Sequence, residues 1–256
     1  MALVSGEAGI GKTRLTTALA EIAGEYDIPV ARGYAVDDPG MPPLWPWRRL
    51  ARDVHVLGAV LSAAGTAVDS ASARFAMFTD ASEALTDAAA GSGLVIVLED
   101  LHWADQTSLR LLRHLAGELA RTRLLVVGTF READDSALAD LLRTTRSIRL
   151  AGLSRPDIAQ WLRLLAPDAD VETLADRLST STGGNPLFVR VVVDRMADLG
   201  TFADYDLAAH PELRRLVPAQ IDQLPEPVKQ LLGAASVLGE HIDPPLLATV
   251  SGLDTA

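Results

Sequence analysis

A stretch near the start of the chain has the spacing of a phosphate-binding loop. Residues 6–13 read GEAGIGKT, which satisfies the pattern GxxxxGK[ST]. The glycines of such a loop let successive backbone N–H groups point at phosphate oxygens. Lys12, one of only two lysines in the chain, would place a positive charge on the β- and γ-phosphates, and the Thr13 hydroxyl would ligate Mg²⁺. The pattern therefore predicts a site for ATP with Mg²⁺, and a chance glycine turn is the alternative.

Two acidic residues form a second candidate site at the end of an apolar run. Leu94 to Leu98 are all apolar, and Glu99 and Asp100 follow directly. Carboxylates at the end of a buried strand can hold Mg²⁺ and orient the attacking water. By position Glu99 fills the magnesium slot and Asp100 the water-activating slot, although the longer Glu99 could bend away and leave the metal to Asp100. The other interpretation is an acidic turn in which Asp105 caps the next helix.

The elements around these residues predict a parallel sheet with crossover helices, because short apolar runs alternate with helical patterns. We expect strands at 2–5, 29–35, 94–98, 124–130 and 147–150. We expect helices at 12–23, 47–64, 73–90 and 106–121. After Leu150 only helical patterns follow, and Ser154 with Asp157 has the spacing of a helix-capping pair. The sequence therefore predicts an α/β unit followed by a helical region.

Several segments resemble one family. Residues 99–105, EDLHWAD, resemble the signature of STAND-type ATPases, which are the AAA-like domains of large LuxR-family transcriptional activators and related signalling proteins. The segments GEAGIGKTRL at 6–15, PPLWPW at 42–47, VVGTFRE at 126–132 and GGNPLFV at 183–189 are similar to the same family. The resemblance runs along nearly the whole chain.

The resemblance implies a P-loop NTPase core with helices on both faces of its sheet at 1–151, a helical lid at 152–210 and an incomplete winged-helix-like module at 211–256. It implies that Thr129 lies near the γ-phosphate, that Arg131 senses that phosphate as part of the catalytic set, and that Asn185 and Pro186 form a nucleotide-proximal turn. The expected nucleotide-binding loop comprises Gly6, Glu7, Ala8, Gly9, Ile10, Gly11, Lys12, Thr13 and Arg14. The expected metal ligands are Thr13, Glu99 and Asp100.

The sequence also departs from the family in two ways. Glu99 stands where the strict pattern prefers Asp, so we expect slow hydrolysis. The upstream Gly-Arg-Glu element that helps enclose adenine is missing, so we expect the chain to be a fragment of a longer protein.

The composition of the chain limits the classes of partner that it can bind. The chain has 34 acidic and 23 basic residues, for a net charge of -11, which argues against binding a nucleic-acid backbone. It has no cysteine, so disulfides and thiolate metal sites are excluded. The longest stretch without a charged side chain, residues 54–68, is too short and too polar to span a membrane. We expect a cytoplasmic protein whose partners are ATP or ADP and protein domains of its own or of a partner, with a possible nucleotide-dependent oligomer.

Three functions compete on the sequence alone. The leading hypothesis is an ATP-driven switch, the second is a nucleotide-binding scaffold that does not hydrolyse, and the third is a small-molecule kinase, for which no acceptor site is evident. Trp45 and Trp47, flanked by prolines, are expected to attach a long loop to the core rather than to form a stacking surface.

Overall fold

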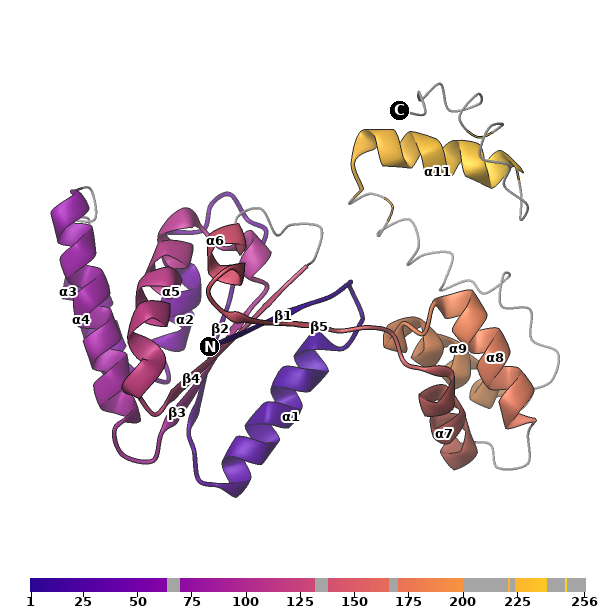
Figure 1. The fold of residues 1–256 in the computed structure, drawn as a ribbon, viewed down its shortest axis with the longest axis horizontal. Helices are drawn as coiled ribbons and strands as arrows, with labels where there is room; N and C mark the ends of the chain where they lie inside the picture. The colour runs from indigo at the N-terminus through magenta and orange to yellow at the C-terminus, as the bar shows by residue number, and fades with distance from the viewer. Residues whose placement is uncertain are drawn as a thin grey trace. The chain divides into compact units, whose positions relative to one another are not determined.

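The computed structural model describes residues 1–63, 70–131, 138–165, 170–199, 221, 224–238 and 247 (Figure 1). The chain divides into two compact units, Met1–Gly152 and Leu153–Ala256. The expected winged-helix-like module at 211–256 lies largely outside the described residues. None of the helices within the described ranges is long and apolar enough to cross a membrane.

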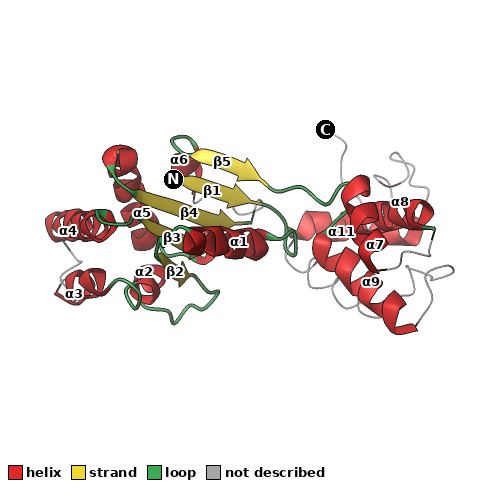
Figure 2. Ribbon diagram, turned by 90° about the horizontal axis from the view of Figure 1, so that it is seen from below, coloured by secondary structure: helices red, strands yellow, loops and turns green. Residues whose placement is uncertain are grey.

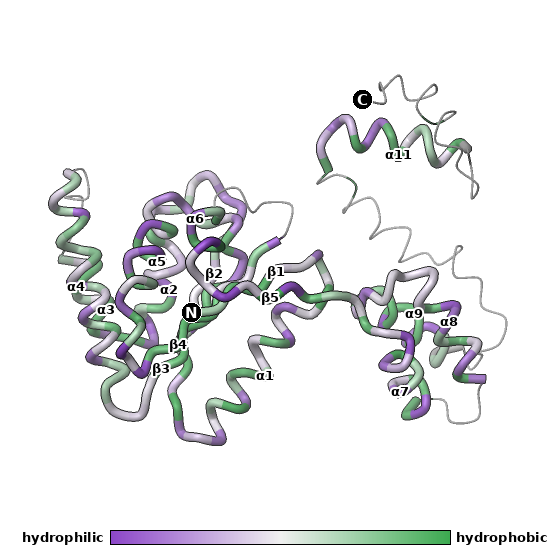
Figure 3. The backbone as a smooth tube through the Cα atoms, viewed as in Figure 1, coloured by the Kyte–Doolittle hydropathy of each residue, from purple (hydrophilic) through white to green (hydrophobic). Residues whose placement is uncertain are grey.

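The first unit is built on a parallel sheet of five strands in the order β2-β3-β4-β1-β5. The strands are β1 Ala2–Ser5, β2 Val30–Tyr34, β3 Leu94–Glu99, β4 Leu124–Phe130 and β5 Arg146–Arg149. Hydrophobic residues run along β3 and β4 (Figure 3), as expected for strands that helices cover on both faces. The predicted parallel sheet is confirmed. Since all strands are parallel, the residues that follow β1, β3 and β4 meet at one edge of the sheet.

Helices cover both faces of the sheet (Figure 2). One face carries α1, Lys12–Glu25, where Ala23 packs with Val95 and Val97 of β3. The opposite face carries α2 Trp45–Leu50, α3 His55–Ala63, α4 Ala71–Ala89, α5 Gln106–Glu118 and the short α6 Ala139–Leu142. Two short 3₁₀ turns, Leu101–Trp103 and Leu119–Arg121, flank α5. The result is the three-layer α/β arrangement expected from the sequence.

The segment predicted as one helix at 47–64 is two helices, so that prediction is wrong. Helix α2 ends at Leu50 and α3 begins at His55. Between them, Asp53 Oδ2 accepts a hydrogen bond from the backbone N–H of Arg32 in β2 over 3.1 Å. The break therefore brings a carboxylate to the backbone of the outermost strand, a contact that helical periodicity cannot predict.

Trp47 attaches the loop before α2 to the core, as predicted. Its side chain is buried, and its Nε1–H donates to the carbonyl oxygen of Ser108 over 3.1 Å. Nearby, Asp105 caps α5, because its Oδ1 accepts the backbone N–H groups of Thr107 and Ser108, each at 3.0 Å.

The second unit contains α7 Arg155–Leu165, α8 Val171–Thr182, α9 Pro186–Leu199 and α11 Glu226–Leu238. Helices α7 to α9 share a hydrophobic core of their own. The predicted capping pair is confirmed at the start of α7: Ser154 N–H donates to Asp157 Oδ2 over 3.1 Å, and Asp157 N–H donates to Ser154 Oγ over 3.4 Å.

Candidate nucleotide-binding site

The glycine loop joins the end of β1 at Ser5 to the start of α1 at Lys12. Gly9 and Gly11 have φ angles of 77° and 104°, which side-chain-bearing residues rarely adopt. At Gly6 a Cβ atom would lie 2.7 Å from Cγ2 of Ile10, so that position has no room for a side chain. The loop is thus a tight backbone turn that ends on a helix N-terminus, the arrangement that favours anions.

Lys12 lies inside this loop. Its side-chain ammonium donates to the carbonyl oxygens of Gly6 and Glu7, each over 2.8 Å. Burial lowers the pKa of Lys12 below its ordinary value; the negative charge of Asp100 opposes this, the positive charge of Arg131 adds to it, and Glu7 opposes it more weakly. Asp100, which follows β3, and Arg131, which follows β4, therefore both act on the pKa of Lys12, which follows β1.

Glu99, the last residue of β3, is held by two side chains that the sequence analysis did not identify. The Thr16 hydroxyl of α1 lies 2.8 Å from Glu99 Oε1, to which it can donate. Arg32 of β2 places Nη1 3.8 Å from the same oxygen, and its Nη2 donates to the backbone carbonyl of Thr16 over 3.0 Å. Arg32 is the only charged residue in the segment 29–35, and this isolated charge could have identified it as a candidate site residue. Thr16 gave no such signal.

Asp100 leaves the strand with a different backbone conformation. Its φ and ψ are 57° and 44°, in the left-handed region that Asp tolerates better than most residues. Its backbone N–H donates to the hydroxyl of Thr129 in β4 over 3.1 Å, and Thr129 is buried. The two acids act on different groups: Glu99 contacts α1 and β2, whereas the charge of Asp100 acts on Lys12.

The remaining predicted residues fall into two places. Thr13 and Arg14 are exposed in the first turn of α1, where Arg14 forms an exposed ion pair with Glu21 at 3.1 Å. Asn185 and Pro186 belong to the second unit. Asn185 is buried, and its Oδ1 accepts the backbone N–H of Leu187 over 3.1 Å at the start of α9. The structure therefore assigns Asn185 a local helix-capping role.

The site provides oxygen ligands of the kind that Mg²⁺ prefers. Within the described ranges no group of three or more His, Asp or Glu side chains could hold a metal by itself. Mg²⁺ is commonly bound by one or two carboxylates together with phosphate oxygens and water. The Thr13 hydroxyl and the carboxylates at the end of β3 are oxygen ligands of that kind.

Comparisons with known proteins agree with this geometry. Residues 1–127 match the family described as the AAA ATPase domain. A search among curated proteins gave no match. Among solved structures, the chain is similar to a Signal Transduction ATPase with Numerous Domains (STAND) protein with a tetratricopeptide repeat sensor from Pyrococcus horikoshii. The identity is 18% and the TM-score 0.50, over 99% of this chain and 34% of that protein, so this chain spans about a third of its length.

Two further structures are less similar. The RuvB Holliday junction branch migration motor of Thermotoga maritima is 16% identical over 99% of this chain and 74% of its own, with a TM-score of 0.45. The Orc1 protein of Aeropyrum pernix, solved in complex with DNA, is 18% identical over 98% of this chain and 70% of its own, with a TM-score of 0.44. Residues 1–127, which carry the glycine loop and both acidic residues, thus match the AAA ATPase domain family, and the chain has a fold similar to that of a STAND protein.

Proposed function

We propose that the first unit binds ATP with Mg²⁺ and acts as a switch, hydrolysing ATP slowly to drive conformational signalling in a cytoplasmic regulator, which we expect to control transcription. The observation that carries the proposal is the position of Lys12. Its ammonium lies in the glycine loop and is coupled electrostatically to both Asp100 and Arg131. A single site thus holds a cation for the phosphates, an acid for water or metal, and a second cation that can respond to the γ-phosphate.

Each side chain has a role in this proposal. Backbone N–H groups of residues 6–13 bind the phosphates, and Lys12 exchanges the carbonyls of Gly6 and Glu7 for phosphate oxygens. The Thr13 hydroxyl and Asp100 would hold Mg²⁺, which would supply positive charge beside the phosphates. Arg131 lies close enough to affect Lys12 and is suited to stabilise the same charge.

For the metal ligand we favour Asp100, which is the alternative that the sequence left open. Glu99 is engaged by Thr16 and Arg32, so its carboxylate serves to connect β3, α1 and β2. The charge of Asp100 acts on the pKa of Lys12. The backbone N–H of Asp100 is held by the Thr129 hydroxyl. We therefore assign metal and water contacts to Asp100 and a bracing role to Glu99.

The engagement of Glu99 also favours a second candidate function. With one acid occupied by Thr16 and Arg32, the site has fewer groups for activating water. A scaffold that holds ATP or ADP without turning it over, and so fixes a partner-binding conformation, is consistent with that arrangement. Phosphate release by the purified chain, lost in Asp100→Asn, separates the switch from the scaffold.

The test of nucleotide binding uses the only two lysines of the chain. Lys12→Ala should abolish binding of a fluorescent ATP analogue, while Lys229→Ala, which removes a lysine of α11 that lies 3.9 Å from Glu226, should not change it. Circular dichroism should show the same helix content for both variants. Equal affinity of the two variants would show that the glycine loop does not bind ATP.

A further inference from the structure

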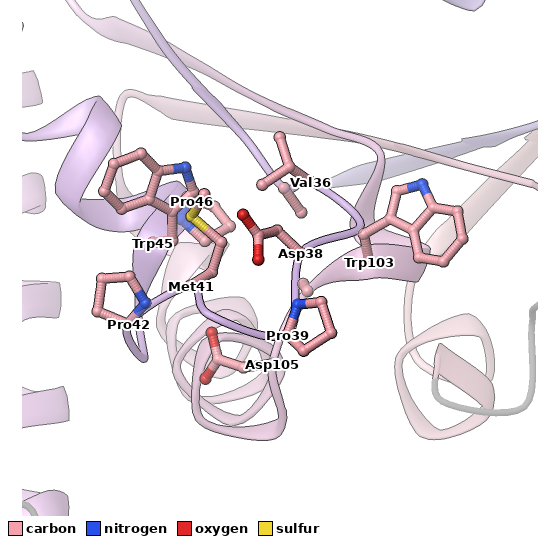
Figure 4. A pocket seen from close by; sticks show the side chains of 11 residues that line it. Val36, Asp38, Pro39, Met41, Pro42, Trp45, Pro46, Trp103 and Asp105 are labelled. Carbon is pink, nitrogen blue, oxygen red and sulfur yellow. The ribbon is translucent and has the colours of Figure 1, made fainter.

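A cavity of about 230 Å³ lies away from the glycine loop. It is formed by the segment after β2, residues 35–46, and by residues 103–105 after β3 (Figure 4). Both segments leave the carboxyl ends of neighbouring strands, and β4 separates β3 from the strand that carries the glycine loop. No residue of the glycine loop lines this cavity. Any ligand of this cavity must therefore be inferred from the side chains that line it.

Trp45 provides a hydrogen-bond donor that the described residues do not use. Its Nε1 atom is buried, yet no described residue accepts a hydrogen bond from it. Trp47, two residues later, donates from the same atom to Ser108. Since a buried N–H without an acceptor costs free energy, Trp45 is a position at which a ligand oxygen would be favoured. The prediction that both tryptophans attach the loop to the core thus holds for Trp47 and leaves Trp45 with a different role.

The cavity contains two carboxylates, and only one is available. Asp105 is used by the fold: its Oδ1 caps α5, and its Oδ2 accepts the backbone N–H of Leu44 over 3.0 Å. Asp38 is exposed, its Oδ1 accepts the N–H of Gly40 over 2.8 Å, and none of the described residues forms an ion pair with it. In Figure 4 the Asp38 carboxylate points toward the side of the cavity that Trp45 forms, and the Trp103 ring points away from it. The cavity therefore presents one available negative charge among apolar side chains.

A cation next to Trp45 is already engaged by aromatic rings. The Arg49 guanidinium lies 4.7 Å from the centroid of Tyr34 and 5.9 Å from that of Trp45. A ligand cation would accordingly be attracted to Asp38 rather than to the Trp45 ring that Arg49 faces.

We propose that this cavity binds an arginine side chain of a polypeptide partner. The Asp38 carboxylate pairs with the guanidinium, and a backbone carbonyl of the partner accepts from Trp45 Nε1–H. Walls of proline and tryptophan suit the methylene stem of arginine and its weakly hydrated, planar head. The volume lies below the ~300–1,000 Å³ typical of drug-sized ligands, so it fits one side chain better than a whole small molecule. This inference does not depend on nucleotide binding.

The test follows the indole N–H signals of the full chain by ¹H–¹⁵N NMR, with Trp45 assigned from Trp45→Phe. The probe is the blocked peptide Pro-Pro-Arg-Pro-Pro, which is pre-organised in an extended conformation. We expect a saturable shift of the Trp45 signal at about millimolar peptide, with the Trp47 signal unchanged. The same peptide with citrulline, which has the shape of arginine without its charge, should bind about tenfold more weakly or not at all.

Two variants locate the charge. Asp38→Asn should weaken the Arg peptide about tenfold, the loss expected for one charge-assisted hydrogen bond, whereas Asp37→Asn, outside the cavity, should bind like the parent. The proposal is overturned if no peptide shifts the Trp45 signal, if citrulline binds as well as arginine, or if Asp38→Asn and Asp37→Asn behave alike. Equal affinity for free arginine would overturn the polypeptide assignment, because it would leave no contribution from the partner's backbone.

Discussion

The Thr16 hydroxyl and Glu99 Oε1 lie 2.8 Å apart, which joins the first turns of α1 to the last residue of β3. The same hydroxyl lies 3.0 Å from the backbone oxygen of Thr13. The helix that follows the glycine loop is thus connected through one side chain to the acidic strand end.

Removal of that hydroxyl should destabilise the first unit. Thr16→Val keeps the shape of the side chain but leaves the half-buried Glu99 carboxylate without this donor. We expect the free energy of unfolding in urea to fall by about 1–2 kcal/mol. Thr17→Val is the matched control, because Thr17 Oγ1 donates only to the backbone oxygen of Thr13 and does not reach Glu99. Equal losses in the two variants would mean that the contact with Glu99 contributes nothing.

The two acids should differ in what they support. Asp100→Asn should keep ATP affinity in the absence of Mg²⁺, lose the gain that Mg²⁺ gives, and reduce phosphate release by about 10²-fold or more, because an amide cannot take a proton from water. Asn also tolerates the left-handed backbone of this position.

Glu99→Gln should instead lower stability through its contact with Arg32 and keep the response to Mg²⁺. Isothermal titration calorimetry with and without Mg²⁺ measures both variants. The reverse pattern would assign the metal to Glu99, as the motif position alone suggests.

The lowered pKa of Lys12 predicts proton uptake on ATP binding. In the free protein, burial disfavours the charged ammonium, so Lys12 begins to lose its proton below the ordinary 10.5. Bound phosphates favour the charged form and raise the pKa again. ATP affinity should therefore fall as pH rises through the free-protein pKa. Calorimetry in two buffers of different ionisation enthalpy, at neutral and at alkaline pH, should reveal an uptake that is larger at the alkaline pH. Buffer-independent heats at both pH values would contradict this.

Arg131 should distinguish ATP from ADP. Its charge acts on Lys12, and we propose that it responds to the γ-phosphate. Arg131→Ala should weaken ATP binding about tenfold, as expected for one charge-assisted hydrogen bond, and leave ADP affinity nearly unchanged. Competition titrations with both nucleotides measure the ratio. An equal loss for both would indicate a structural ion pair.

Gly128 of β4 should be sensitive to a single added methyl group. A Cβ atom there would lie 2.5 Å from Cδ1 of Leu101 and 2.8 Å from Cδ2 of Leu3, and both leucines are buried. Gly128→Ala should cost about 1–3 kcal/mol of unfolding free energy by overpacking. Gly117→Ala, in α5 with open space around it, should instead stabilise by up to about 1 kcal/mol. Thermal unfolding of both variants decides, and a neutral Gly128→Ala would show that the leucines can move aside.

Local patterns predicted the parts of this site that are local in the chain. The glycine loop and its flanking strand and helix follow from the fixed spacing of residues 6–13, and the apolar run before Glu99 identifies β3. The parallel sheet follows because helices alternate with strands. These features depend on backbone geometry within a few residues.

Contacts between distant segments were not predictable in the same way. Glu99 and Thr16 are 83 positions apart, so no spacing rule relates them. At the break between α2 and α3, Asp53 contacts the backbone of Arg32, 21 positions away, and the helical periodicity of that stretch gives no sign of this contact. The left-handed conformation of Asp100 was not predictable either, because an Asp at a strand end is compatible with several turns.

The contact between Asp53 and β2 has a consequence for how copies of this protein meet in concentrated solution. β2 is one outer strand of the sheet, and an unprotected outer strand can pair with another chain and start aggregation. On this free edge, Asp53 occupies the N–H of Arg32. The other outer strand, β5, carries exposed Arg146 and Arg149, which repel a second copy of themselves. Each outer strand thus carries a feature that opposes strand addition: a carboxylate bonded to the backbone of β2, and positive charge on β5.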